Sequence, residues 1–178
     1  MDKPRIQSRL AELFGARRPT MWITRERPKI DRIACPWLIR RFIDPQAVIL
    51  YVPTAKVFDV GARSGAVAFD IPGAPLSHVG DRCSFDAFID QFGLYDPGLE
   101  ALAPIVRGAD TDRHELAPEA AGLHALSLGL STMFGDDQAL LTFGLTIYDA
   151  FYAWAMNARG QRHDWRPQSI MEQTDVGT

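Results

Sequence analysis

The sequence predicts an α+β fold that is predominantly helical, with a small sheet of about three short strands covered by a bundle of four or more helices. Two observations predict this class. Short apolar segments of strand length alternate with segments of helical spacing in the first seventy residues. The apolar segments after residue 84 all have helical length and spacing, so the expected order is β-α-β-α-β followed by four helices.

Local signals predict the elements of the first half of the chain. An amphipathic helix is expected from about Pro4. Proline is tolerated in the first turn of a helix but not in its interior, so Pro36 predicts that the second helix begins near Ile33. Thr54 is expected to cap a third helix. The side chains of that helix expected to face the core are Val57, Phe58 and Val60. Strands are expected over residues 21–24, 47–52 and 66–69.

In the second half, prolines, glycines and capping residues mark the ends of the elements. Residues 70–82 contain two prolines and two glycines, which predicts a loop. Ser84 is expected to be the N-cap of a helix that Gly93 closes. Asp96 and Pro97 open a helix to about residue 106. A polar loop over 108–115 and long helices over 118–134 and 137–159 complete the expected order.

Length and composition indicate one globular domain over residues 21–160, preceded by an amphipathic arm (1–20) and followed by a tail (161–178). The net charge of -3 argues against a general nucleic-acid binder, so nucleic acid is an unlikely partner. The N-terminal residues lack the continuous apolar stretch of a secretory signal, and we expect a cytoplasmic protein. An arm with one apolar face either packs on a second subunit, giving a homodimer, or is disordered in isolation.

One segment has the length of a membrane span. Residues 139–158 carry a single charge, Asp149, but they also contain several polar side chains. Placing a carboxylate in the middle of a bilayer costs roughly several kcal/mol. We therefore interpret this segment as a buried core helix and expect no membrane partner.

Two segments combine aromatic, charged and thiol side chains in the way that pocket walls do. Residues 22–44 contain five arginines and two tryptophans together with Cys35, and residues 69–88 contain His78 and Cys83. A plain surface helix needs the charges but not the tryptophans. We therefore expect these two segments to form facing walls of a pocket.

Several residues within these and later segments could bind a metal ion, although each has a structural alternative. His78 lies in the loop after a predicted strand, where sites are common, but it could simply bond a carbonyl. Asp110 and Asp112, with the nearby His114 and Glu115, form a cluster whose carboxylates could converge on a cation or could be a solvated loop. No standard zinc or EF-hand spacing is present.

Asp149 lies within an apolar helix, so it needs a partner. The expected partners are arginines, by a structural salt bridge or in a pocket, and the candidates are Arg32, Arg40 and Arg107. Tyr148 and Tyr152 stand one turn apart and could present hydroxyls to the same cavity. Arg82 and a helix starting at Ser84 would lower the pKa of the Cys83 thiol, although buried cysteines that only fill space are commoner.

Taken together, five motifs resemble the C-terminal domain family of the chromate-resistance protein ChrB. They are found, in order, in residues 22–44, 69–73, 78–88, 105–112 and 148–154. The resemblance covers residues 21–158, nearly all of the chain after the arm. It implies a link to chromate resistance, in which family members often act as regulators of the chromate exporter.

The resemblance implies that the motif residues form a metal or oxyanion pocket. The implied metal ligands are His78, Asp110 and Asp112, with Asp31 or Asp149. Imidazole and carboxylates suit a divalent ion such as Mn, Fe or Zn. The residues expected to bind a small anionic ligand or substrate are Arg32, Arg40, Arg107 and Trp37. Those expected to act in catalysis are Arg32, Tyr148 and Tyr152.

Three functions compete on this basis. The first is a metal-dependent enzyme with lyase-like or hydrolase-like chemistry on a small anion. The second is a non-catalytic sensor for chromate or a related oxyanion, whose binding depends on the arginines more than on His78. The third and weakest is thiol redox chemistry at Cys83.

Overall fold

A three-stranded parallel sheet forms one layer of the fold. The computed structural model describes residues 3–161. Strands β1 (Met21–Arg25), β2 (Val48–Val52) and β3 (Val67–Ala68) are arranged in the order β2-β1-β3. In the central strand, Trp22, Ile23 and Thr24 are fully buried, so both faces of the sheet are covered.

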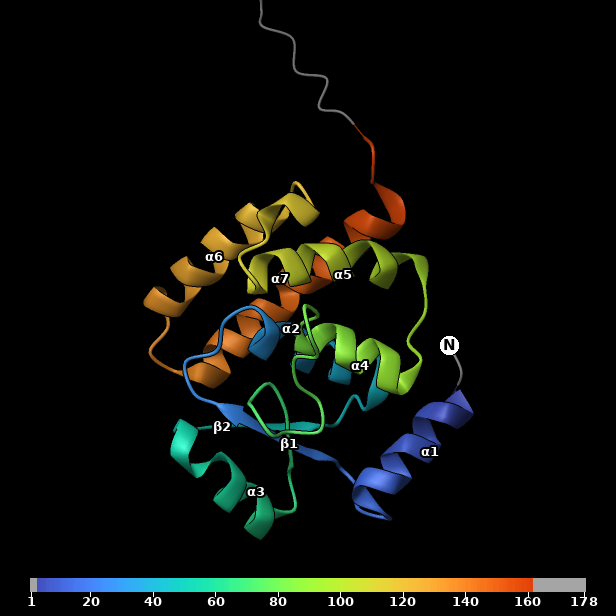
Figure 1. Ribbon diagram of the computed structural model, residues 1–178, viewed down its shortest axis with the longest axis vertical. Helices are drawn as coiled ribbons and strands as arrows, with labels where there is room; N and C mark the ends of the chain where they lie inside the picture. The colour runs from blue at the N-terminus through green and yellow to red at the C-terminus, as the bar shows by residue number, and fades with distance from the viewer. Residues whose placement is uncertain (1–2, 162–178) are drawn as a thin grey trace, which may run out of the picture.

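Two helical crossovers connect the parallel strands, as parallel pairing requires. Helix α2 (Asp31–Leu38) continues into a π-helical turn (Ile39–Ile43) between β1 and β2. A 3-10 turn (Thr54–Lys56) and α3 (Val57–Ser64) connect β2 to β3. Figure 1 shows α3 on one side of the sheet and α2 and the later helices of the chain on the opposite side. The predicted β-α-β-α-β order is confirmed.

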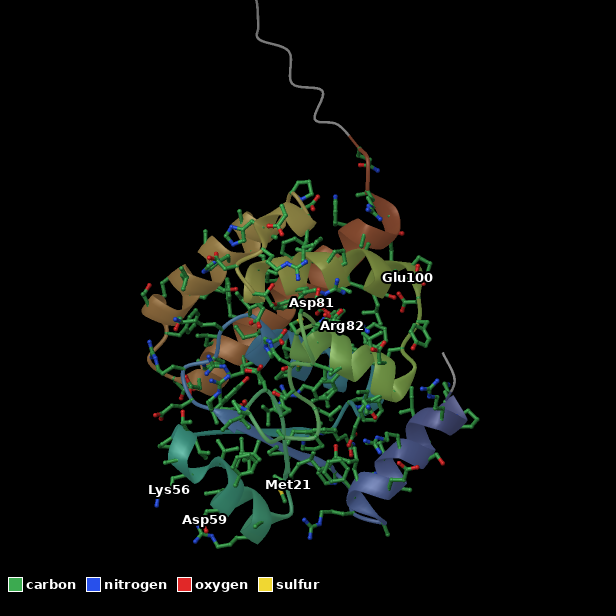
Figure 2. The ribbon with its side chains drawn as sticks, viewed as in Figure 1. Met21, Lys56, Asp59, Asp81, Arg82 and Glu100 are labelled. Atoms are coloured by element: carbon green, nitrogen blue, oxygen red, sulfur yellow. The ribbon has the colours of Figure 1, made fainter. Side chains whose placement is uncertain are left out.

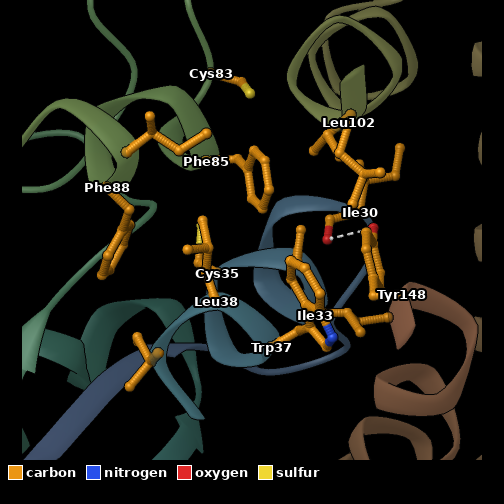
Figure 3. Packing of buried hydrophobic residues seen from close by; sticks show 14 of the residues in the cluster. Ile30, Ile33, Cys35, Trp37, Leu38, Cys83, Phe85, Phe88, Leu102 and Tyr148 are labelled. Carbon is orange, nitrogen blue, oxygen red and sulfur yellow. Dashed lines mark hydrogen bonds between the residues drawn. The ribbon is translucent and has the colours of Figure 1, made fainter. Parts of the chain in front are cut away.

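The main hydrophobic core lies between the sheet and a layer of helices. These helices are α4 (Ser84–Phe92), α5 (Pro97–Asp110), α6 (Ala120–Met133) and α7 (Asp137–Asn157), with a 3-10 turn (His114–Leu116) before α6. Trp37, Phe85 and Tyr148 meet in this core, where Trp37 stacks on Phe85 with ring centroids 6.4 Å apart (Figure 3). The predicted class, α+β and mostly helical, is confirmed.

Helix α2 begins two residues before its predicted start, so Pro36 lies inside it rather than in its first turn. Because proline has no N–H, the carbonyl of Arg32 cannot receive the usual helical hydrogen bond. The hydroxyl of Tyr51 on β2 donates to that carbonyl instead, at 2.6 Å. A tertiary hydrogen bond therefore compensates for the proline and allows the helix to start at Asp31.

Two predicted caps are wrong. Thr54 begins a 3-10 turn, and its side chain caps no helix. Phe58 of the following helix was expected to face the core but is half exposed. Ser84 is the first residue of α4, and Cys83 is its N-cap, with Asp86 accepting from the Cys83 N–H at 3.1 Å. The hydroxyl of Ser84 is thereby free to contact a different carboxylate, described below.

Helix α5 extends four residues beyond its predicted end, as far as Asp110. Its start is as predicted, because the Asp96 carboxylate accepts from the Leu99 N–H at 2.9 Å and Pro97 follows the cap. The first residues of the predicted polar loop are therefore helical. This extension places Asp110 at the C-terminal end of a rigid element.

The N-terminal arm contains the predicted amphipathic helix, α1 (Lys3–Phe14). Ile6 and Leu10 are buried in the main core, and α1 packs beside α4 (Figure 1). Part of the apolar face of the arm therefore packs within the same chain, where Leu13 and Phe14 are partly buried, and the homodimer stays a prediction. The predicted tail lies outside the described residues except for residue 161.

Helix α7 is buried along one face only. Leu140, Leu141, Gly144 and Tyr148 are its buried residues, whereas Phe143 and Met156 are about half exposed. Among the described helices it has the length and hydropathy of a membrane span, and 22% of that segment is buried. The expectation of a buried core helix therefore holds only for the face that packs against α2 and α5.

Candidate metal centre beside His78

Three aspartates surround the imidazole of His78. The Nε2 atom of His78 lies 3.1 Å from Asp110 Oδ2, 3.5 Å from Asp70 Oδ1 and 3.6 Å from Asp31 Oδ2. The ligand atoms of His78, Asp31 and Asp110 all lie within 4.8 Å of one another, a spacing that could hold a metal ion. One imidazole and several carboxylates form a donor set for divalent cations.

Each of these residues comes from a different element. Asp31 is the first residue of α2 and Asp110 is the last residue of α5, and the backbone N–H of Asp31 donates to Asp110 Oδ1 at 3.4 Å. Asp70 follows β3 in a left-handed conformation, and its N–H is bonded to the Leu76 carbonyl at 2.9 Å. That bond closes the turn that leads to His78.

The far end of the His78 loop is tied to two helices. Arg82 pairs with Asp90 of α4 at 2.6 Å, and Asp81 pairs with Arg113, just after α5, at 3.0 Å. Figure 2 labels Asp81 and Arg82 on this loop, which precedes α4. These exposed pairs contribute little energy individually, but they set the direction of the loop that carries His78.

Asp31 is the most unusual residue of the cluster. Its side chain is 1% exposed, and its Oδ2 atom accepts from the backbone N–H groups of Ser84, at 2.5 Å, and Phe85, at 3.3 Å. These groups belong to the N-terminus of α4, where a negative charge is favoured. The Oδ1 atom is buried without a hydrogen-bond partner among the described residues. Burial and the neighbouring Asp110 and Asp70 carboxylates raise the pKa of Asp31 well above its usual value.

Asp70 has the opposite balance. Burial alone would raise the pKa of Asp70, but hydrogen bonds from His78 and Ser84 and the charges of two arginines outweigh it, so the pKa is lowered. The Ser84 hydroxyl donates to Oδ1 at 2.8 Å. Arg25 donates to Oδ2 at 3.0 Å, and Arg32 Nε lies 3.4 Å from the same oxygen. Asp70 therefore has its own counter-charges.

His78 is the part of the cluster open to solvent. Its side chain is 41% exposed, whereas Asp110 is 18% exposed. Hydrogen bonds to Asp110 and Asp70 raise the pKa of His78 to about 10. Without a cation the imidazole is therefore protonated and supplies positive charge to the three carboxylates.

Of the predicted metal ligands, the structure brings His78, Asp31 and Asp110 together and places the other two elsewhere. Asp149 is half exposed and accepts from Arg41 Nη2 at 2.6 Å and from Trp37 Nε1 at 2.8 Å. Its partner is therefore none of the three arginines that we expected. The expected partner was wrong because Arg41 lies in the π-helical turn, where the side chains point in other directions than in a continuous α-helix.

Asp112 also lies apart from His78. Its carboxylate is 83% exposed, and it is 3.5 Å from His114 and 3.9 Å from His124. Since α5 ends at Asp110, the two aspartates of the cluster diverge after the last helical turn.

The predicted anion-binding arginines do not converge. Arg32 is at the site through Asp70. Arg107 forms a bidentate pair with the buried Asp86, at 2.7 and 2.6 Å, which joins α5 to the start of α4. Arg40 donates to the Ala47 carbonyl at 3.4 Å, in a separate polar cavity beside β2.

The predicted aromatic site residues belong mainly to the core. Trp37 is 1% exposed. The Tyr148 hydroxyl donates to the Ile30 carbonyl at 3.2 Å, next to Asp31 in sequence (Figure 3). Tyr152 donates to Asp96 at 3.2 Å. The two tyrosine hydroxyls thus have different hydrogen-bond partners.

Sequence reasoning missed three contributors to the cluster, Asp70, Ser84 and Arg25. A signal for Asp70 was available, because it follows a predicted strand in the Phe-Asp-Ile-Pro-Gly motif. The thiol hypothesis is not supported. Burial first, and then the Asp31 and Asp86 carboxylates, raise the pKa of Cys83, which opposes formation of the thiolate.

Comparison with known proteins places the whole cluster inside the region matched by one family model. The family model described as "ChrB, C-terminal domain" matches residues 22–155. The chain belongs to the ChrB C-terminal domain family. Over 132 residues it is 37% identical to Protein ChrB of Cupriavidus metallidurans strain CH34, which is 74% of this chain and 39% of that protein. The matched region of this ChrB-family chain thus spans well under half of the relative. No solved structure is significantly similar to it.

Proposed function

We propose that this ChrB C-terminal domain binds one divalent metal ion between His78, Asp31 and Asp110, and uses it in lyase-like or hydrolase-like chemistry on a small anion in chromate resistance. The observation that carries the proposal is the convergence of ligand atoms of His78, Asp31 and Asp110 within 4.8 Å of one another, at a carboxylate whose buried Oδ1 atom has no hydrogen-bond partner among the described residues. A buried carboxylate oxygen without a partner is costly, whereas a cation would satisfy it.

The charges around the cluster support a cation. Asp70 is neutralised by Arg25 and Arg32, which leaves Asp31 and Asp110 to share the single charge of His78. A divalent ion that replaces the proton of His78 would balance both remaining carboxylates. Asp70 would then lie behind the metal ligands, where carboxylates commonly orient the ligating side chains.

The donor set suits manganese, iron or zinc. Imidazole with carboxylates binds all three ions, and three protein ligands leave positions for water or substrate. The exposed side of His78 provides access from solvent. Such an ion supplies Lewis acidity and a water molecule of lowered pKa. Arg25 and Arg32, on the other side of Asp70, would favour a substrate with negative charge.

Manganese binding to tag-free protein tests the metal site. Wild-type protein should bind about one Mn²⁺ per chain, measured by electron paramagnetic resonance of the free ion and by elemental analysis. Asp31→Asn and His78→Gln should each abolish this binding. Asp149→Asn is the matched control, because it makes the same chemical change at a carboxylate that pairs with Arg41 instead, and it should bind as wild type. Equal binding by all four proteins would refute the site.

Turnover tests the catalytic half of the proposal. Metal-loaded wild-type protein would be screened against small phosphate, sulfate and carboxylate esters and against hydroxy acids. Metal-dependent turnover that His78→Gln removes would support an enzyme. Stoichiometric metal without turnover of any of these substrate classes would argue against it.

A second candidate function, an oxyanion-binding module, is supported by a separate cavity of about 700 Å³. Arg40 and Arg41 line it together with Gln46 and Gln138. Guanidinium and amide donors of this kind can bind a tetrahedral dianion. Titration of chromate and sulfate against wild type and Arg40→Gln tests this candidate: loss of binding in the variant supports it, and no binding by wild type refutes it.

A further inference from the structure

A second group of metal-ligating side chains lies after the end of α5. Asp112 is in the turn that follows the helix, His114 begins the 3-10 turn, and His124 is in the second turn of α6. Two ring nitrogens face each other, with His114 Nε2 2.9 Å from His124 Nδ1. The Asp112 Oδ1 atom lies 3.5 Å from the first nitrogen and 3.9 Å from the second.

The spacing of the two nitrogens suits a shared metal ion. With metal–nitrogen bonds of about 2.0–2.1 Å, two ligands at right angles lie about 2.9 Å apart, and two tetrahedral ligands lie about 3.3–3.4 Å apart. The observed 2.9 Å equals the right-angle value, and a small rotation of either ring reaches the tetrahedral one. The Asp112 oxygen lies at distances that the same ion could bridge after a similar adjustment.

We propose that Asp112, His114 and His124 form a second site, for a borderline transition-metal ion such as Cu²⁺, Ni²⁺ or Zn²⁺. The site is distinct from the one at His78, with which it shares no residue. Two imidazoles and one carboxylate form a softer donor set than one imidazole and two carboxylates, so the two sites differ in preference. The two imidazoles are about one-third exposed and the Asp112 carboxylate is almost fully exposed, so an ion could enter and keep water ligands.

The alternative is a hydrogen bond between two neutral imidazoles, one donating its N–H to the other. The rings are nearly perpendicular, at 72°, with centroids 5.1 Å apart. A hydrogen bond accounts for the two histidines but assigns no role to Asp112, whose Oδ1 atom lies 3.5 Å from one ring nitrogen and 3.9 Å from the other. A metal ion accounts for all three side chains.

Copper(II) provides the test, because its paramagnetic resonance spectrum reports bound nitrogens. The background protein is the tag-free 178-residue chain with His78→Gln/His163→Gln, in which His114 and His124 are the remaining histidines. Residue 163 lies outside the described residues, so it is removed as a source of nitrogen ligands. We expect about one bound Cu²⁺ with splitting from two equivalent imidazole nitrogens.

Adding His124→Gln should weaken Cu²⁺ binding at least tenfold and remove the two-nitrogen splitting. Asp112→Asn should also weaken binding while keeping the splitting. Glu115→Gln is the matched control, because this neighbouring carboxylate pairs with Arg113 rather than with the histidines, and it should leave binding unchanged. Circular dichroism shows whether each variant is folded.

Two outcomes would overturn the proposal. In the first, the background protein binds no copper, which would leave the hydrogen bond as the role of the histidine pair. In the second, His124→Gln keeps the two-nitrogen spectrum. Neither outcome bears on the manganese experiment, which measures a harder ion at His78, so the two sites succeed or fail separately.

Discussion

Replacing Asp31 with asparagine should stabilise the metal-free protein while abolishing metal binding. The Asp31 side chain is buried, with two carboxylates and one imidazolium as its charged neighbours. Asparagine keeps an oxygen that accepts from the N-terminus of α4, where Ser84 donates at 2.5 Å. It replaces the unpartnered oxygen with an amide group that can donate to a neighbouring carboxylate.

The size of the effect follows from the charge that is removed. Burying an ion whose charge is incompletely compensated costs roughly several kcal/mol, and the charge of His78 offsets part of that cost. We therefore expect Asp31→Asn to raise the free energy of unfolding at pH 7 by about 1–3 kcal/mol in the presence of a chelator. For a chain of this length each kcal/mol shifts the melting temperature by about 2–4 °C.

Urea unfolding with and without Mn²⁺ measures both halves of this prediction. At a free Mn²⁺ concentration of about one hundred times the dissociation constant, wild-type protein should gain about 2.7 kcal/mol, and Asp31→Asn should gain nothing. Asp31→Ala, which also removes the acceptor for Ser84, should be less stable than wild type in the chelator. If Asp31→Asn were less stable than wild type without metal, the assignment of an uncompensated charge to this position would be refuted.

Three further predictions test the scaffold. Tyr51→Phe should lower the free energy of unfolding by about 1–2 kcal/mol, because it leaves the carbonyl of Arg32 without a donor; an equal loss in a Pro36→Ala background would contradict this. The arginine partner of Asp149 lowers its pKa, so its stabilisation is present above the unfolded pKa of about 3.9 and is lost as the pH falls through the folded value. Asp149→Asn should therefore cost under about 1 kcal/mol at pH 6 and nothing near pH 2, by thermal melts; an unchanged difference across this range would exclude the mechanism. Gly144→Ala should lower the free energy of unfolding by about 1–3 kcal/mol, because the new methyl group would lie 2.5 Å from a side chain of α2. Gly129→Ala is the control, because the space around it is open, and it should be neutral or stabilising. Equal urea midpoints for the two variants would contradict the packing.

The fold was largely predictable from local patterns. Strand-length apolar runs and helical spacing are short-range properties, and they correctly predicted three strands, two crossovers and four following helices. The predicted helix boundary was wrong where a side chain from a distant element makes a hydrogen bond that local sequence could not show. Helix α2 starts before its expected residue because the Tyr51 hydroxyl, from another element, satisfies a carbonyl that Pro36 leaves open.

The candidate site was predictable in part. His78, Asp31 and Asp110 were all identified from residue type and motif, and the structure brings them together. Asp149 was included wrongly, since its pairing with Arg41 depends on the π-helical turn, which has no simple sequence pattern. The pairing of Asp112 with His124 was missed because the two residues belong to different elements. The helical spacing around His124 does not show that this residue faces the turn after α5.

The sequence by itself therefore determined the elements, their order and the family, because these depend on local spacing and on ordered motifs. Only the tertiary structure decided which carboxylates share a site. Asp31, Asp70 and Asp110 come from three elements whose ends meet at His78, and no local periodicity relates them. Packing of α2, α4 and α5 brings these ends together, and the same packing leaves the Oδ1 atom of Asp31 buried without a hydrogen-bond partner among the described residues.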